Sequence, residues 1–193
     1  SSKEFKTLSF HQDKVHDFAW FADKRYHVLI DTITLPSGKK ISSFSYFTNR
    51  EARFWKRSPE YLRKSILDFS KWYGEYAYNV VSAADVQDAA GNGMEYPTIT
   101  AIGAYGDSVE LEKTIAHEVA HNWFYGILGS DERRNSWMDE GLTQFSEIRY
   151  VYSEYPNNVD VQNEHWRIWL PFHELNDEDK VNDKFKSYHS YAL

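Results

Sequence analysis

The chain has 193 residues, of which 41% are hydrophobic and 17% aromatic, enough for one substantial core. Its formal net charge of −7 argues against a nucleic-acid-binding protein, which needs a basic footprint. The absence of cysteine excludes disulfide frameworks, thiolate zinc sites and cysteine nucleophiles. No stretch approaches the roughly 20 apolar residues of a membrane span, so we expect no membrane contact by these residues.

The first part of the chain is predicted to be β-structure. Strand composition recurs over residues 18–21, 26–30 and 41–47, and a Pro-Ser-Gly turn separates the last two. Three strands make a thin sheet with little core of its own, so we expect this part to pack against another element.

Helical periodicity begins at Pro59, which suits the first turn of a helix, and continues to Gly74. Residues 79–86 then have the composition of a strand. A further strand is predicted over 94–102, where Pro97 interrupts the run. Such an interruption is typical of an edge strand or a bulge, and a peptide can lie against an edge strand.

The clearest predicted helix covers residues 109–128 and has one apolar face. After a polar loop, Ser136 and Asp139 resemble the capping box of a second helix that runs to about Tyr155. A third helix is expected over 160–175.

His117-Glu118-Val119-Ala120-His121 is an H-E-x-x-H motif inside the clearest helix. Residues four apart lie one turn apart on the same face of a helix, so both imidazoles can reach one ion, and neutral imidazole suits zinc. Glu118 is one step round the helix, where a general base for metal-bound water is expected. The alternative is a solvated helix face that carries two histidines.

A zinc peptidase usually has three protein ligands and an open coordination position. Glu140 is the candidate third ligand, because the eighteen residues between it and His121 leave room for the rest of the helix, a loop and a helix start. A carboxylate in that first turn is also favoured by the helix dipole. The alternative is a glutamate that serves only the dipole.

Together these residues resemble the gluzincin peptidases, and within them the membrane alanyl aminopeptidase family, which includes the leukotriene hydrolase. The histidines and Glu140 have the gluzincin spacing, and Trp123-Phe124 matches the family's H-E-x-x-H-x-W-F run. Residues 137–141 are similar to the family's W-L-N-E-G, with Asp139 in place of the usual asparagine.

A second motif of this family lies upstream. Gly93-Met94-Glu95-Tyr96 resembles the exopeptidase motif G-x-M-E-N, with Tyr96 in place of asparagine. The resemblance implies that Glu95 binds the free α-amine of a substrate, since a carboxylate near the metal pairs with an ammonium group. We expect Gly93 and Met94 to belong to the same substrate-binding segment.

The resemblance implies an α+β, thermolysin-like catalytic domain over residues 55–193, in which a small mixed sheet is followed by helices that carry the zinc site. Residues 1–54 are expected to be a remnant of the family's amino-terminal β-domain. The family's catalytic tyrosine lies in a Y-x-K-G-like run, which neither Tyr188 nor Tyr191 matches. We therefore expect a truncated catalytic domain, with that tyrosine beyond residue 193.

The predicted function is a zinc aminopeptidase with one zinc ion on the two histidines and the third ligand. Glu118 would accept a proton from the attacking water, and Glu95 would hold the amino terminus of the peptide substrate. The backbone at Ala101, Gly103 and Ala104 is expected to hold the peptide as an added strand.

Three other functions remain open. A gluzincin endopeptidase would have no need of Glu95, and a peptide-binding module would keep zinc without turnover. A structural zinc protein would have no open coordination position. The sequence assigns neither a compartment nor an oligomeric state.

Overall fold

The computed structural model describes residues 5, 7–86, 93–103 and 106–163. Its sheet begins with an antiparallel hairpin of β1 (His27–Thr34) and β2 (Lys40–Phe47). Gly38 in the connecting turn has a φ of 88°, a conformation that favours glycine. Along β2, residues on one face are buried, as expected for a strand with one face on the core.

Three further strands complete a mixed five-stranded sheet in the order β1-β2-β3-β5-β4. β3 (Val80–Asp85) lies between β2 and β5 (Ile99–Ile102) and is parallel to both. The short β4 (Gly93–Met94) pairs with β5 in the antiparallel direction and forms one end of the sheet. The predicted strand over 94–102 is therefore two strands, and the turn that contains Pro97 separates them.

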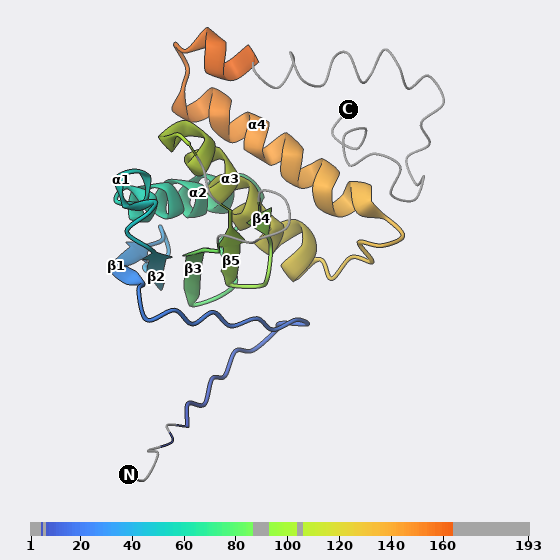
Figure 1. The fold of residues 1–193 in the computed structure, drawn as a ribbon. Coiled ribbons are helices and arrows are strands. Elements are labelled where there is room, and N and C mark those ends of the chain that lie inside the picture. The colour runs from blue at the N-terminus through green and yellow to red at the C-terminus, as the bar shows by residue number, and fades with distance from the viewer. Residues whose placement is uncertain (1–4, 6, 87–92, 104–105, 164–193) are drawn as a thin grey trace.

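The helices form two layers on this sheet (Figure 1). α2 (Ser58–Tyr73) and α3 (Ser108–His121) pack on the strands, and α4 (Leu142–Glu154) packs mainly on α3. A short α1 (Ala52–Trp55) precedes α2. The core between the sheet and the inner helices consists largely of aliphatic and aromatic side chains, which include Ile33, Ile41, Leu62, Ile66, Phe69, Val81, Ile102, Leu111, Ile115 and Val119.

Local sequence signals account for the ends of the two inner helices. α2 has Pro59 in its first turn and ends at Gly74, whose φ is 101°, as predicted. α3 begins after Asp107, whose side chain accepts hydrogen bonds from the backbone N–H groups of Val109 and Glu110 at 2.7 and 3.1 Å.

Several predicted elements differ from the structure. Residues 18–21 form no strand, and the helix predicted over 109–128 is α-helical only to His121. It continues as a π-helical segment, η1 (Asn122–Ile127). Ser136 makes no capping hydrogen bond, because it already has helical backbone angles before the second π-helical segment, η2 (Trp137–Gly141). Of the predicted third helix, residues 160–163 are helical and the remainder lies outside the described residues.

The predicted α+β class is confirmed by this mixed sheet and its helices. The strands on both sides of residue 54 belong to one sheet, because β2 pairs with β3 from Ser42 to Tyr46. This pairing is an observation against a separate domain over residues 1–54, and the division remains a prediction. Among the helices that the structure describes, none combines the length and apolarity that a membrane crossing needs.

Candidate metal centre

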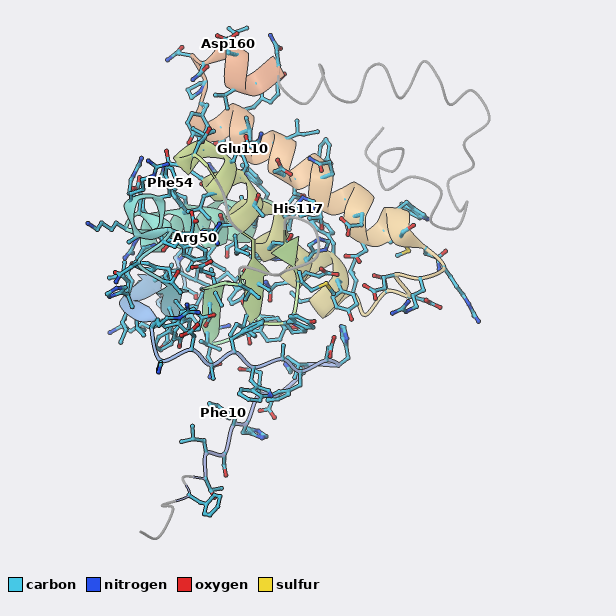
Figure 2. All side chains as sticks on the ribbon, viewed as in Figure 1. Phe10, Arg50, Phe54, Glu110, His117 and Asp160 are labelled. Carbon is cyan, nitrogen blue, oxygen red and sulfur yellow. The ribbon has the colours of Figure 1, made fainter. Side chains whose placement is uncertain are left out.

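The two histidines of the H-E-x-x-H motif lie one turn apart on α3, with ring centroids 5.0 Å apart. Glu140 reaches them from η2, which follows a loop after the end of η1. Its Oε2 lies 3.3 Å from Nε2 of His117 and 3.7 Å from Nε2 of His121. Figure 2 shows His117 on α3, where that helix faces α4. The three predicted ligands therefore converge.

This arrangement fits a zinc ion. One potential ligand atom from each of His117, His121 and Glu140 lies within 4.8 Å of the other two. Tetrahedral zinc, with bonds of about 2 Å to nitrogen and oxygen, places neighbouring ligand atoms roughly 3.3 Å apart. The two measured Nε2–Oε2 distances, 3.3 and 3.7 Å, are close to that separation. The donor set of two imidazoles and one carboxylate is also one that zinc accepts.

Carboxylates behind the histidines orient both rings. Nδ1 of His117 lies 3.0 Å from Oε2 of Glu147, and Nδ1 of His121 lies 2.5 Å from Oδ1 of Asp139. Oγ1 of Thr143 is a further neighbour of His121, 3.3 Å from Nδ1. A hydrogen bond from Nδ1–H leaves the lone pair of Nε2 for a metal, so both rings are presented in the form that a ligand needs.

The sequence analysis missed Glu147, although its spacing was a usable signal. Glu147 lies seven residues after Glu140, which is two helical turns on the same face. Asp139 was noted as part of a capping box and as a replacement for asparagine, but its pairing with His121 was not predicted.

The charges around the histidines favour a cation. Burial alone would lower the pKa of His121, but Asp139 and Glu140 outweigh it and raise the pKa to about 9. For His117, burial is likewise outweighed by Glu140 and Glu147, which raise its pKa well above the usual value. A metal ion would compete with protons for these two rings and would take over the positive charge that the carboxylates favour.

Glu140 is held as a carboxylate. Burial would raise its pKa, but the hydrogen bond to His117 and the charges of both histidines lower it to about 2. A deprotonated side chain is the form in which glutamate ligates a metal.

Glu118 points toward the sheet and is 5% exposed. Its Oε1 is so close to Gly93 that a Cβ built on the glycine would lie 2.1 Å away. Its Oε2 is buried and has no hydrogen-bond partner among the described residues. Burial raises the pKa of Glu118 to about 7, against the opposing charges of His117 and His121. A carboxyl group with this pKa can both accept and return a proton near neutral pH.

Glu95, just after β4, is 8% exposed. Potential ligand atoms of Glu95, His121 and Asp139 lie within 4.8 Å of one another. Burial raises the pKa of Glu95, and the attraction of His121 opposes that shift. The structure thus brings the predicted amine-binding carboxylate next to the predicted metal ligands.

The turn between Glu95 and β5 is held by the first residue after α3. Oδ1 of Asn122 accepts hydrogen bonds from the backbone N–H of Thr98 at 3.0 Å and from the hydroxyl of Tyr76 at 3.3 Å. Thr98 has a φ of 68°, so this turn contains a left-handed residue that the Asn122 contact stabilises. Asn122 therefore helps to set the position of the turn that follows Glu95.

The predicted peptide-holding backbone is only partly available. Ala101 pairs with Ala84 of β3 on one side and with Met94 of β4 on the other, so it does not lie on a free edge. The end of the sheet is β4, which contains Gly93 and Met94. Gly103 is buried after β5, and Ala104 lies outside the described residues.

Both π-helical segments adjoin candidate ligands. η1 begins directly after His121, and η2 contains Glu140. A π-helical turn is rare and is found often at functional sites, because its wider winding turns side chains away from their α-helical directions. No periodicity in the sequence signalled either segment.

Comparison with known proteins gives a consistent set of similarities. Residues 69–191 match the model of the peptidase family M1 domain. A mutant M1 zinc metallopeptidase from Deinococcus radiodurans has a TM-score of 0.63 and 15% identity, over 86% of this chain and 36% of that chain. Legionella pneumophila aminopeptidase A in complex with aspartic acid has a TM-score of 0.62 and 16% identity, over 87% of this chain and 20% of that chain.

At 15% and 16% sequence identity, these two structures show only that this chain has a similar fold. This chain spans about a third of the length of the Deinococcus structure and a fifth of the Legionella structure. Among curated proteins, the search found no sequence match.

Proposed function

Because the chain belongs to peptidase family M1, we propose that it is the catalytic region of a zinc-dependent aminopeptidase, of the membrane alanyl aminopeptidase and leukotriene hydrolase type. The observation that carries this proposal is the convergence of three ligand atoms, from His117, His121 and Glu140, beside the buried carboxylate of Glu118. The substrate is a peptide with a free amino terminus.

Nε2 of His117, Nε2 of His121 and Oε2 of Glu140 would hold one zinc ion, while Glu147 and Asp139 keep the two rings oriented. When bound, zinc supplies a Lewis acid that polarises the peptide carbonyl and lowers the pKa of a water to about 7. The remaining chemistry falls to side chains of this chain.

Glu118 is the proposed proton carrier. Its Oε2 is free to accept a proton from the attacking water, because no described group donates a hydrogen bond to this atom. The pKa of about 7 allows the same atom to return the proton to the leaving amine. The buried surroundings of Glu118 limit exchange of that proton with solvent.

Glu95 is the proposed recognition group for the amino terminus. Its buried carboxylate is near His121, so an ammonium group paired with it would place the first peptide bond beside the metal ligands. The outer edge of β4, with Gly93 and Met94, would align the peptide by strand addition. In the proposal, Ala101 supports β4 from behind through its pairing with Met94, and neither Ala101 nor Gly103 contacts the peptide directly.

The proposal is tested by zinc analysis and by hydrolysis of two matched peptides, one with a free and one with an acetylated amino terminus. We expect one zinc per chain and cleavage of the free peptide only. Glu118→Gln should retain zinc and lose most hydrolysis. Cleavage of both peptides would instead identify an endopeptidase, and zinc without any turnover would favour a peptide-binding module.

A further inference from the structure

The interface between α3 and α4 contains polar side-chain contacts at three successive levels. His121 of α3 meets Thr143 of α4 at 3.3 Å, and one turn back His117 meets Glu147 at 3.0 Å. Further along, at a level that contains no metal ligand, Glu112 of α3 accepts a hydrogen bond from the hydroxyl of a tyrosine on α4. Residue numbers decrease along α3 as they increase along α4, so the two helices are antiparallel.

The apolar packing of α4 includes Tyr150 and Val151, both fully buried, and the ring centroid of Tyr150 lies 6.1 Å from that of Phe69. Five of its residues are buried, namely Thr143, Ser146, Glu147, Tyr150 and Val151. Three of these side chains are polar, so hydrogen bonds act beside the apolar contacts of Tyr150 and Val151 against a shift of α4 along α3. Because hydrogen bonds are directional, these contacts help to determine the register between the two helices.

Glu112 makes several polar contacts in this interface. It is 1% exposed, and its Oε1 and Oε2 accept hydrogen bonds from the hydroxyls of Tyr150 at 2.8 Å and Tyr155 at 2.6 Å. Nζ of Lys64 on α2 lies 3.4 Å from Oε1 and also pairs with Glu154 at 2.8 Å. The carboxylate thus ties together three helices through donors that approach from different directions.

We propose that Glu112 is a positioning residue for the zinc centre, which acts through Tyr150 and Tyr155 to set the register of α4 on α3. Tyr150 lies one helical turn from Glu147, so the contact that holds the tyrosine also places Glu147 against His117. The inference rests on the proposed function, since it assumes that zinc binds at this centre.

The geometry leaves little tolerance for a shift. A slip of one residue would move α4 by about 1.5 Å along its axis and turn its side chains by about 100°. The 3.0 Å contact between Nδ1 of His117 and Oε2 of Glu147 would then be lost. Only Gly141 separates Glu140 from the start of α4, so Oε2 of Glu140 would be displaced as well.

The test removes the tyrosine hydroxyls and measures zinc affinity in the 193-residue chain. Tyr150→Phe and Tyr155→Phe each delete one hydroxyl donor and keep the aromatic ring. The two variants are measured singly and combined. We expect the double variant to bind zinc roughly tenfold more weakly, the lower end of the loss that outer hydrogen-bond partners cause. Affinity is measured by competition with a chromophoric chelator, which does not depend on turnover.

Ile33→Val provides the matched control, because Ile33 is fully buried in β1 at the opposite end of the sheet from β4. It should lower the melting temperature and leave zinc affinity unchanged. Glu112→Gln is a second variant that keeps the acceptor shape but removes the charge, and it should also weaken zinc binding.

The positioning role would be overturned if the double variant and Glu112→Gln bound zinc as tightly as wild type and, like the control, lost only melting temperature. The proposed function would still stand in that case. A wild-type chain that binds no zinc would overturn both. Weaker zinc binding in these variants, with normal affinity in Ile33→Val, supports the inference.

Discussion

Gly93 on β4 lies against the carboxylate of Glu118 on α3, so that a Cβ built on the glycine would be 2.1 Å from Oε1 and 2.4 Å from Cδ of Glu118. The backbone of Gly93 has no left-handed φ, so the close approach, and not the local conformation, requires glycine here. β4, the strand proposed to bind the peptide, thus lies directly against Glu118, the proposed proton carrier.

Gly93→Ala is expected to reduce kcat/KM by roughly 100-fold, because a displacement of about 1 Å in a reacting group has an effect of this size. Zinc affinity should change little, since the three heavy atoms nearest to the added methyl group all belong to Glu118, which is not a proposed ligand. Steady-state kinetics and chelator competition measure the two quantities. Gly106→Ala is the control, because no atom lies within 4 Å of the Cβ position at Gly106. Full activity in Gly93→Ala would contradict the assigned position of Glu118.

Asp139→Ala should weaken zinc binding by about 10- to 100-fold, because His121 loses the partner of its Nδ1. Asp139→Asn should cause a smaller loss, since an amide oxygen can still accept the hydrogen bond from Nδ1. The two variants compared by zinc competition separate ring orientation from charge. Equal affinities for wild type and Asp139→Ala would rule out a role for this contact in zinc binding.

Removal of zinc should destabilise the chain. A ligand present at 100 times its dissociation constant stabilises the folded state by about 2.7 kcal/mol, provided that the unfolded chain does not bind it. Chelation should therefore lower the melting temperature in differential scanning fluorimetry. Glu140→Ala removes one of the three candidate ligands, and its melting temperature should respond much less to zinc. An equal response in wild type and variant would place the zinc elsewhere.

Asp68 on α2 should make stability depend on pH. Burial, and secondarily the Glu154 charge, raise the pKa of Asp68 above 3.8, and its Oδ2 has no hydrogen-bond partner among the described residues. A raised folded-state pKa means that ionisation disfavours folding above that pKa and has no effect below the unfolded pKa. Asp68→Asn should therefore raise the melting temperature near pH 7 and leave it unchanged near pH 3.

Glu60→Gln is the control of opposite sign for this pH experiment. The hydrogen bond from Arg57 lowers the pKa of Glu60, so its ionised form stabilises the fold above the unfolded pKa. This variant should lower the melting temperature near pH 7, by a small amount because the pair is exposed, and lose the effect as the pH falls. Shifts of the same sign in both variants would contradict the assignment.

Local patterns in the sequence were sufficient for α2 and for the part of α3 that carries the two histidines. The spacing of His117 and His121 places both on one face of any α-helix, so their convergence did not depend on the rest of the fold. Pro59 and Gly74 marked the two ends of α2 for similarly local reasons, a preset φ and a positive φ. The motif resemblance also led to Glu140 and Glu95, which the structure brings beside the histidines.

Contacts between distant segments were not predictable in this way. The pairing of Glu147 with His117 exists because α4 packs antiparallel on α3, and the pairing of β2 with β3 exists because a parallel crossover joins them. The π-helical winding of η1 and η2 and the failure of Ser136 to cap are further consequences of the surrounding structure.

The sequence by itself determined the chemistry of the candidate centre: two imidazoles and a carboxylate at ligand spacing, with a second carboxylate beside them and no cysteine in the chain. Only the tertiary structure decided how that chemistry is supported, through Asp139 and Glu147 behind the rings and Gly93 against Glu118. The physical reason is the distance along the chain over which each effect acts. Helical spacing acts over a few residues of one segment, whereas burial, close approach and hydrogen bonds between helices arise only when separate segments pack together.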